Sequence, residues 1–181
     1  MSSRTQCPQC GDLLVQPTGP IKSDILLIGD LPDWWDVIKG KAFSVGYFKF
    51  GKYVQRAGDI LRDLLTANSI RPERCRMTNV WLHAAKKDTE CNIDYHIEQV
   101  YKEMAKAKTI LLMGTLSVRL LLQEAGAREW SGLEILSPDL PRGSQAMGSV
   151  KMATGFKHLG EAQLAIKRFS EMVHEVSLDT T

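Results

Sequence analysis

The sequence predicts an α/β fold, arranged as a three-layer α/β/α sandwich around a four-stranded, mostly parallel central sheet. Short apolar segments alternate along the chain with longer segments whose apolar residues recur at helical spacing. Such alternation is typical of a parallel sheet covered by helices on both faces. With 181 residues, of which 44% are hydrophobic, the chain can form one domain, residues 1–181, with a real core.

Four segments have the character of strands. DILLIG and KTILLMG are short apolar runs that end at glycine, RMTNVWL is rich in residues that favour strands, and SVKMATG follows a long loop. The strands are therefore expected at residues 24–29, 76–82, 108–114 and 149–155.

Four other segments predict helices, because their apolar residues fall on one face. The first begins near Lys52, directly after an aromatic stretch, and the third begins at Thr115, a good N-cap, and stops at Gly126. Glycine and proline make residues 127–149 loop-like. The helices are expected at residues 52–68, 93–107, 115–126 and 160–176.

Composition narrows the class of protein. The net charge of +2 argues neither for nor against a nucleic-acid partner, since only clustered charge makes a binding face. The longest apolar runs, ILLIG and TILLMG, are too short to cross a bilayer, and the first residues do not resemble a signal peptide. We therefore expect a cytoplasmic protein with no membrane partner.

The cysteines predict a metal site. Cys7 and Cys10 form a tight CPQCG knuckle, and Cys75 and Cys91 follow with fifteen residues between them. Four thiolates in two pairs suit tetrahedral zinc or a [4Fe–4S] cluster. A metal held this way would dock an N-terminal knuckle, about residues 1–20, onto the rest of the chain. The other interpretation is a knuckle beside two incidental thiols.

Residues that follow the predicted strands should meet at one edge of the sheet, where ligands bind in such folds. Asp30 can polarise water there or simply bind nearby backbone N–H groups. Asn79 offers donors and an acceptor that suit an amide-like ring, or it holds a neighbouring loop. Phe43 can stack on a flat ligand, or it belongs to the core.

Further side chains are expected at the same edge. His83 and His158 follow the second and fourth predicted strands, and many of the lysines and arginines fall in or beside the loops. That distribution suits phosphate contacts, although a solvated surface has it too. The adjacent Trp34 and Trp35 carry large apolar areas that require a partner, so their loop either packs under another part of the chain or grips a ligand.

These pieces together resemble the uracil-DNA glycosylase superfamily, especially its iron–sulfur branch. The resemblance rests on the order of IGDLPDWWD, GKAFSVG, TNV and TILLMGTLSVRLLL, and it covers most of the chain from Cys7 to about Val176. The matching motif positions are Gly29, Pro32, Asp36, Gly40, Phe43, Gly46, Thr78, Asn79 and Val80, and Asp30 stands where the family motif has glutamate.

The resemblance implies a DNA glycosylase of base excision repair, which hydrolyses the N-glycosidic bond of a uracil flipped out of DNA. It implies that Phe43 stacks on the base, that Asn79 reads its polar edge, and that Asp30 orients water or excludes the thymine methyl group. His158 is the implied stabiliser of the leaving group. Cys7, Cys10, Cys75 and Cys91 are the implied ligands of a [4Fe–4S] cluster, with zinc as the alternative.

Several positions depart from the family pattern. Asp33 replaces a glycine of the first motif, His158 is displaced within MATGFKHLG, and Cys75 precedes TNV where the family cysteine follows it. An extra stretch, YFKFGKY, follows Gly46.

These departures leave more than one function open. One alternative is an inactive member of the fold that binds DNA, single-stranded DNA included, as a replication accessory. It would recruit a replication or repair protein through Trp34 and Trp35. A zinc-bearing interaction protein unrelated to DNA is the third class.

Overall fold

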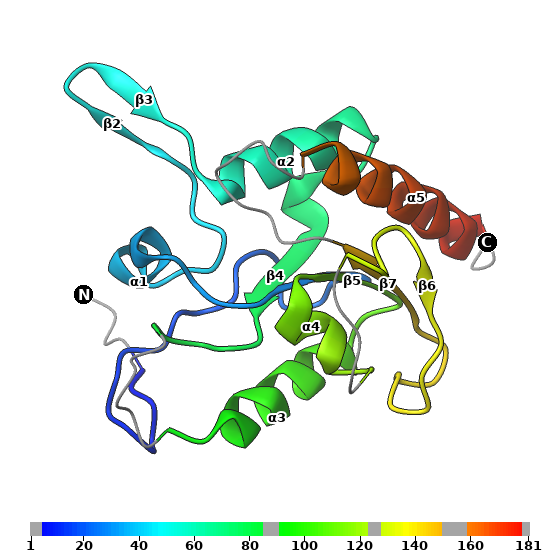
Figure 1. Cartoon of the computed structure of the whole chain (residues 1–181), viewed down its shortest axis with the longest axis horizontal. Helices are drawn as coiled ribbons and strands as arrows, with labels where there is room; N and C mark the ends of the chain where they lie inside the picture. Colours follow the sequence, from blue (N-terminus) through cyan, green and yellow to red (C-terminus); the bar gives the residue numbers. More distant parts are fainter. Residues whose placement is uncertain (1–4, 85–90, 123–127, 150–158, 179–181) are drawn as a thin grey trace.

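A five-stranded sheet forms the centre of the molecule (Figure 1). The computed structural model describes residues 5–84, 91–122, 128–149 and 159–178. The strand order is β4-β1-β5-β7-β6, in which the first four strands run parallel and β6 runs antiparallel to β7. The strands are β1 Ile25–Gly29, β4 Cys75–Asn79, β5 Thr109–Met113, β6 Glu134–Ile135 and β7 Gln145–Ser149.

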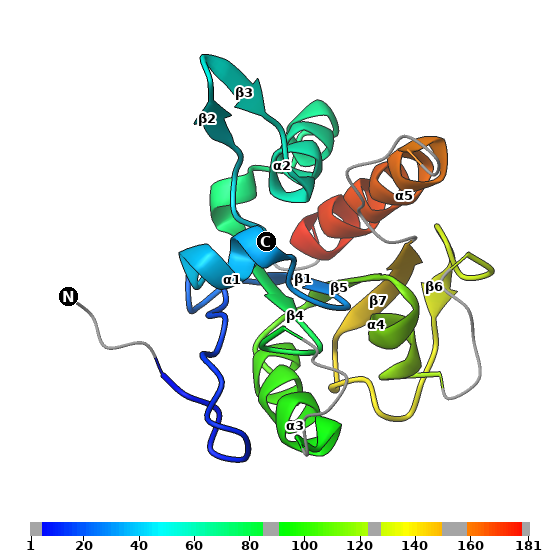
Figure 2. The ribbon, with the colours of Figure 1, turned by 60° about the vertical axis from the view of Figure 1, so that its left-hand side comes forward.

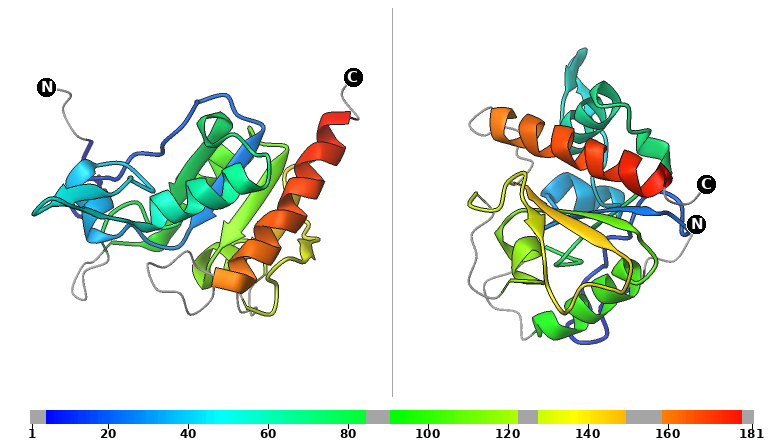
Figure 3. Two further views of the ribbon diagram at one scale, coloured as in Figure 1. Left: turned by 90° about the horizontal axis from the view of Figure 1, so that it is seen from above. Right: turned by 90° about the vertical axis from the view of Figure 1, so that its right-hand side faces the viewer.

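Helices cover both faces of this sheet (Figure 3). Alternate residues of β1 point to opposite faces, so Leu27 packs in one core cluster and Leu26 and Ile28 pack in another. The first cluster includes residues of α2 and α5, and the second includes residues of α3 and α4. These helices are α2 Ala57–Ala67, α3 Ile93–Met104, α4 Thr115–Arg119 and α5 Leu159–Leu178.

The predicted α/β class and its three layers are confirmed, but the strand count is five rather than four. The fourth predicted strand was placed too late, because β7 begins at Gln145 within the segment expected to be a loop. Its alternation of polar and small residues hides a strand that is buried on both faces. Residues 150–155 of the predicted strand lie outside the described residues.

Three elements between β1 and α2, a short helix and the two strands of a hairpin, were missed (Figure 2). The short helix α1, Trp34–Lys39, begins where Asp33 accepts hydrogen bonds from two backbone N–H groups, and it ends at Gly40 in the left-handed region. A hairpin of β2 Tyr47–Lys49 and β3 Lys52–Val54 follows. The helix predicted from Lys52 therefore begins only at Ala57, because β3 occupies its first residues.

The N-terminal segment runs along the outer edge of β4. Thr18 and Met77 exchange backbone hydrogen bonds of 2.8 and 2.9 Å, and the Val15 N–H donates to the Leu82 carbonyl at 2.6 Å. The segment thus covers a strand edge that would otherwise be exposed. Among the described helices, none has the length and apolar character that a bilayer crossing requires.

Candidate functional site

Gly29 and Asn79 lie side by side at the carboxyl ends of β1 and β4. A Cβ built on Gly29 would stand 2.6 Å from the Asn79 Oδ1 and 2.7 Å from the Phe43 Cζ. Both side chains therefore converge on one point beside the end of β1. The absence of a side chain at Gly29 leaves room for that convergence.

Phe43 is held there by its backbone. Its φ of 50° lies in the left-handed region, which costs free energy for any residue other than glycine. The Phe43 carbonyl accepts a hydrogen bond of 2.7 Å from the Arg62 guanidinium and packs against Gly58 of α2. The Ser44 N–H, next along the chain, donates to the Asp36 carboxylate at 2.7 Å. The surrounding loop thus fixes the ring in a conformation that it would not adopt alone.

Asn79 brings an unpaired polar group to this place. Its side chain is only 3% exposed, and its Nδ2 has no hydrogen-bond partner among the described residues. A buried donor left in this way costs about 1–3 kcal/mol. Beside an aromatic ring and a strand end, an amide with a free donor is suited to a ligand that presents a carbonyl oxygen.

Asp30 lies directly after β1 and is buried. Its Oδ1 accepts a hydrogen bond of 2.9 Å from the Ser117 N–H in the first turn of α4. The carboxylate rests on Gly114, where a Cβ would collide with it, and Gly114 has a φ of 120°. The Asp30 carboxylate therefore caps a neighbouring helix as well as lying at the strand end.

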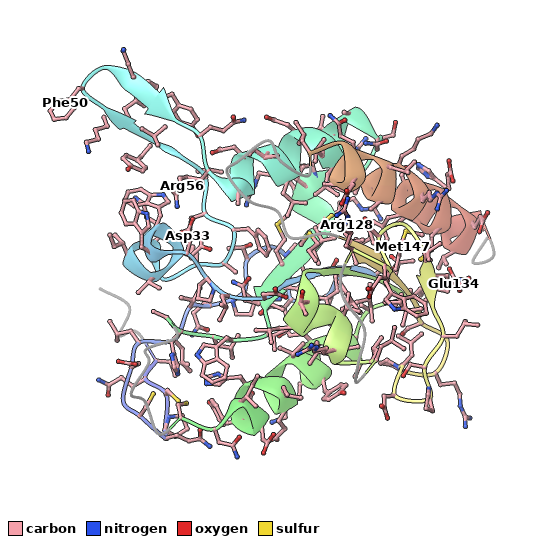
Figure 4. All side chains as sticks on the ribbon, in the orientation of Figure 1. Asp33, Phe50, Arg56, Arg128, Glu134 and Met147 are labelled. Carbon is pink, nitrogen blue, oxygen red and sulfur yellow. The ribbon has the colours of Figure 1, made fainter. Side chains whose placement is uncertain are left out.

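The Asp33 carboxylate is held by α1 and by Arg56. Its Oδ1 caps α1 by accepting hydrogen bonds of 2.8 Å from the Trp35 and Asp36 N–H groups, and its Oδ2 forms an ion pair with Arg56 (Figure 4). Asp36 is buried behind it, and burial raises the pKa of its carboxyl group. The charge that replaces the family glycine is thus bound by α1 and Arg56.

The two tryptophans pack largely on each other and on the hairpin. The Trp35 ring lies 4.2 Å from the Tyr47 ring and 5.5 Å from the Trp34 ring, between centroids. The Trp35 Nε1 also donates to the Val45 carbonyl at 2.9 Å. Trp34 stays 52% exposed. The hairpin thus covers part of the apolar surface of the two tryptophans. A protein partner at this loop stays a prediction.

A second cluster joins Cys7, Cys10, His83 and Cys91. Their ligand atoms all lie within 4.8 Å of one another, and three of the four side chains are buried. The Cys7 and Cys91 sulfurs are 3.5 Å apart, and the His83 Nε2 lies 3.4 Å from the Cys10 sulfur and 3.3 Å from the Cys91 sulfur. Such a set can bind a metal ion.

The surroundings of this cluster orient His83, and they favour a thiolate at Cys7 but not at Cys91. The His83 Nδ1 lies 2.9 Å from the Ala84 carbonyl oxygen, which leaves Nε2 free to face the sulfurs, as in metal sites. Burial raises the pKa of the Cys7 thiol, but backbone N–H groups of Gln9 and Cys10 outweigh it, and the pKa lies below its ordinary value. Burial and then the neighbouring cysteines raise the pKa of Cys91 to about 12.

Among the described residues, Cys75 is not part of this cluster. The prediction that Cys75 is a metal ligand is therefore wrong. Cys75 begins β4, at the opposite end of the strand from Asn79, and is buried in the core with Leu61 and Leu65 of α2. Burial raises the pKa of its thiol to about 12, which is typical of an inert core cysteine. His83 follows the carboxyl end of the same strand and takes the fourth position.

Two other histidines bear on the site. His96 is fully buried, and its Nε2 lies 3.2 Å from the Cys91 sulfur, next to the metal cluster. Burial, and then the neighbouring His83, lower the pKa of His96 to about 4. His158 lies outside the described residues, so its part in the site stays a prediction.

A large hollow of about 950 Å³ lies elsewhere, at the amino ends of the strands, beside Asp24, Ile25 and Thr109. The convergence of Phe43 and Asn79 is at the carboxyl ends, where ligands bind in parallel sheets. We therefore place the candidate site at the carboxyl ends despite the size of the other hollow.

Comparison with known proteins gives one family. The family model described as the uracil DNA glycosylase superfamily matches residues 16–163, which is most of the chain and includes Asp30, Phe43 and Asn79. No curated protein matches the chain.

Proposed function

The chain belongs to the uracil DNA glycosylase superfamily, and we propose that it excises uracil from DNA by hydrolysing the N-glycosidic bond. The observation that supports this most directly is the buried Asn79 Nδ2, which has no partner among the described residues and lies beside Phe43. A flipped uracil presents a carbonyl oxygen and an N–H group side by side, and the amide of Asn79 offers their complements.

Each residue has a distinct task in the proposed reaction. Phe43 stacks on the flat face of the base, and its constrained backbone holds the ring in place before the base arrives. Asn79 donates to a uracil oxygen from Nδ2 and accepts from the ring N–H at Oδ1. Recognition of both groups favours uracil over a base with the opposite pattern, such as cytosine.

The bond cleavage requires charge stabilisation on both sides. The C1′–N1 bond breaks with its electron pair leaving on uracil, and positive charge develops on the deoxyribose. The carboxylate of Asp30 stabilises that positive charge and orients the water whose oxygen joins C1′. The proton that this water loses is taken up by the departing uracil anion, so the products are the free base and an abasic deoxyribose. The fixed position of Asp30 on Gly114 and Ser117 pays part of the orientation cost in advance. His158 is the proposed stabiliser of the uracil anion.

The direct experiment is an incision assay on single- and double-stranded DNA that contains uracil, with cytosine- and thymine-containing DNA as controls. Release of uracil, reduced about 100-fold or more in Asn79→Leu, supports the proposal. Equal activity of the variant would contradict the role of Asn79. No release by the native protein on either form of DNA would reject the enzyme.

The second candidate is an inactive relative that binds DNA as an accessory protein. One observation favours it: the Asp30 carboxylate already binds the Ser117 N–H at 2.9 Å, so a structural role alone accounts for its position. One observation argues against the inactive relative. The Asp33 carboxylate is held by α1 and Arg56, so it does not fill the space beside Phe43. DNA binding without uracil release would support this candidate.

A single zinc ion would be held by Cys7, Cys10, His83 and Cys91 in the proposed enzyme, because this set of donors suits zinc. Three pairs of ligand atoms, Cys7–Cys91, Cys10–His83 and His83–Cys91, lie 3.3–3.5 Å apart, and all four ligand atoms lie within 4.8 Å of one another, a close grouping that suits one ion. A [4Fe–4S] cluster separates its ligands more widely, because each one binds a different iron. Zinc here supplies folding energy rather than catalysis.

This metal would dock the N-terminal knuckle, about residues 1–20, onto a single domain of residues 1–181. Cys7 and Cys10 come from the knuckle, whereas His83 and Cys91 come from the segment between β4 and α3. The ligands therefore tie two parts of the chain that are distant in sequence.

A further inference from the structure

The hairpin β2–β3 projects from the body of the molecule beyond α1 and α2 (Figures 1 and 2). Its turn consists of Phe50 and Gly51, with φ values of 49° and 75°. A Cβ built on Gly51 would meet nothing within 4 Å, so the turn lies in open space. Phe50 is 94% exposed (Figure 4).

The residue at the tip is not the one that the turn favours. A two-residue turn with positive φ at both positions prefers asparagine, aspartate or glycine, because other residues are strained there. Phenylalanine adds both this strain and a large exposed apolar ring. Neither the turn nor the packing among the described residues accounts for Phe50, and contact with a ligand outside the chain does.

The charges of the hairpin indicate what that ligand is. Residues 46–56 contain four aromatic residues, two lysines and one arginine, and no aspartate or glutamate. Lys49 and Lys52 face each other across the strands next to the turn, and both are exposed. The Lys49 Nζ lies 5.7 Å from the Phe50 ring centroid. An apolar ring between cations suits a strand of nucleic acid, whose bases stack and whose phosphates are negative.

The base of the hairpin is anchored while its tip is bare. Asp59 at the start of α2 accepts hydrogen bonds of 2.8 Å from the Tyr53 hydroxyl and the Gly46 N–H. Tyr47 packs on Trp35 on the other side. An isolated two-stranded hairpin is marginally stable, so these contacts hold the tip in a defined direction.

The hairpin also starts from the loop that carries Phe43. Phe50 follows Phe43 by seven positions, a span of at most about 25 Å when extended. That is shorter than one turn of a DNA duplex, which is about 34 Å. The tip is therefore close enough to Phe43 for nucleotides a few positions from a target base to reach it.

From these observations we propose that the hairpin is a second DNA-binding element. Phe50 stacks on a base a few nucleotides from the target, and Lys49 and Lys52 bind the adjoining phosphates. This inference rests on the proposed function for the position of the target base. It adds a contact to nucleotides that Phe43 and Asn79 do not touch.

The test measures binding of the full chain to a fluorescent 20-nucleotide DNA strand, with or without one uracil, over a range of salt concentrations. We expect Phe50→Ala to weaken binding about tenfold at every salt concentration, through lost stacking. We expect Lys49→Ala combined with Lys52→Ala to lower the salt slope by about two, one for each phosphate contact. Leu136→Ala, at a residue that is 81% exposed beside β6, is the control and should bind normally.

A length series separates this inference from the proposed function. A trinucleotide that contains uracil is too short to reach the tip, so the Phe50→Ala variant should release its uracil as fast as the native protein does and should release uracil from the 20-mer more slowly. If the native protein releases uracil from neither DNA, the proposed function fails, and the binding data alone decide the inference. Unchanged affinity and salt slope in both hairpin variants would overturn it and leave a protein partner as the occupant. Unchanged thermal unfolding of the variants verifies their folding.

Discussion

The Asn79 side chain lies against Gly29. The amide oxygen of Asn79 is 2.6 Å from the position that a Cβ on Gly29 would take, and the Phe43 ring is 2.7 Å from the same position. The two side chains that are proposed to hold the base are thus set by a missing side chain on the neighbouring strand. Even one methyl group at residue 29 would push both of them from their places.

The variant Gly29→Ala should therefore lose activity while keeping DNA affinity. Displacement of recognition groups by about 1 Å costs roughly 100-fold in rate. The measurement is single-turnover uracil release together with binding to the same DNA. Gly160→Ala is the matched control, since a Cβ there meets nothing within 4 Å. A fully active Gly29→Ala would show that the base does not bind between Phe43 and Asn79.

Two variants of Asp30 should distinguish the role of its negative charge in excision from its role as a cap of α4. Asp30→Asn keeps an oxygen that can accept from the Ser117 N–H, so stability should change little while excision falls. Asp30→Ala also removes the cap, at a further cost of about 1 kcal/mol in unfolding free energy. Denaturant titration and excision rates on the two variants distinguish these effects. Asp24→Asn, just before the same strand, is the exposed control. Retained activity in Asp30→Asn would assign the residue to structure alone.

The metal site should depend on Cys91 and not on Cys75. Cys91→Ser removes one ligand, so purified protein should contain less zinc and unfold at lower temperature, as native protein should after treatment with a chelator. Cys75→Ala should retain its zinc, although it loses core packing. Metal analysis of both variants decides between them. Iron and sulfide in the native protein, in place of zinc, would contradict the single-ion site.

Arg56 should stabilise α1 through Asp33. Arg56→Ala leaves the Asp33 carboxylate without its ion-pair partner, close to the buried Asp36, whose pKa is already raised by burial. We expect a loss of about 1–2 kcal/mol in unfolding free energy for this partly buried pair. Lys102→Ala removes an exposed pair with Glu98 and should cost less than about 0.5 kcal/mol. Equal losses of unfolding free energy in the two variants, measured by chemical denaturation, would mean that the Asp33–Arg56 pair stabilises the fold no more than the exposed pair does.

Glu103 should make stability fall in acid. Burial raises the pKa of Glu103, but the hydrogen bonds and charge of Arg76 outweigh it, and the pKa lies below its ordinary value of 4.5. A lowered carboxyl pKa stabilises the fold above 4.5, and this contribution is lost as pH falls through the lower native value. Glu103→Gln should therefore be less stable than the native protein at pH 7 and lose less stability between pH 5 and pH 3, measured by thermal unfolding. Parallel pH profiles would contradict this assignment.

Periodicity in the sequence was sufficient for the main layers, because β1, β5 and the long helices bury continuous or regularly spaced apolar residues. It failed at the hairpin, where Tyr53 and Val54 also fit a helical pattern and only the turn at Phe50 and Gly51 separates the two interpretations. It failed at β7, whose Gly148 and Ser149 are buried by tertiary packing alone.

The metal ligands show a different limit. Counting cysteines favoured Cys75, but position along a strand decides which side chains meet. Cys75 begins β4 and His83 follows its end, so of these two residues it is His83 that lies with Cys91 near the knuckle. The direction of β4 was predictable from the sequence. It was the available signal that His83, and not Cys75, lies at the same end of the strand as the other metal ligands.

The ligand pair Cys7 and Cys91 lies 84 residues apart in sequence and 3.5 Å apart in space. A metal bound between them would act on the unfolded chain as well as on the native one, because it would close a loop that contains β1, the hairpin, α2 and β4. By analogy with a covalent cross-link, closing a loop of this length removes chain entropy worth about 4–5 kcal/mol from the unfolded state. The strands that carry Gly29 and Asn79 would thus be kept together by a restraint that touches neither of them.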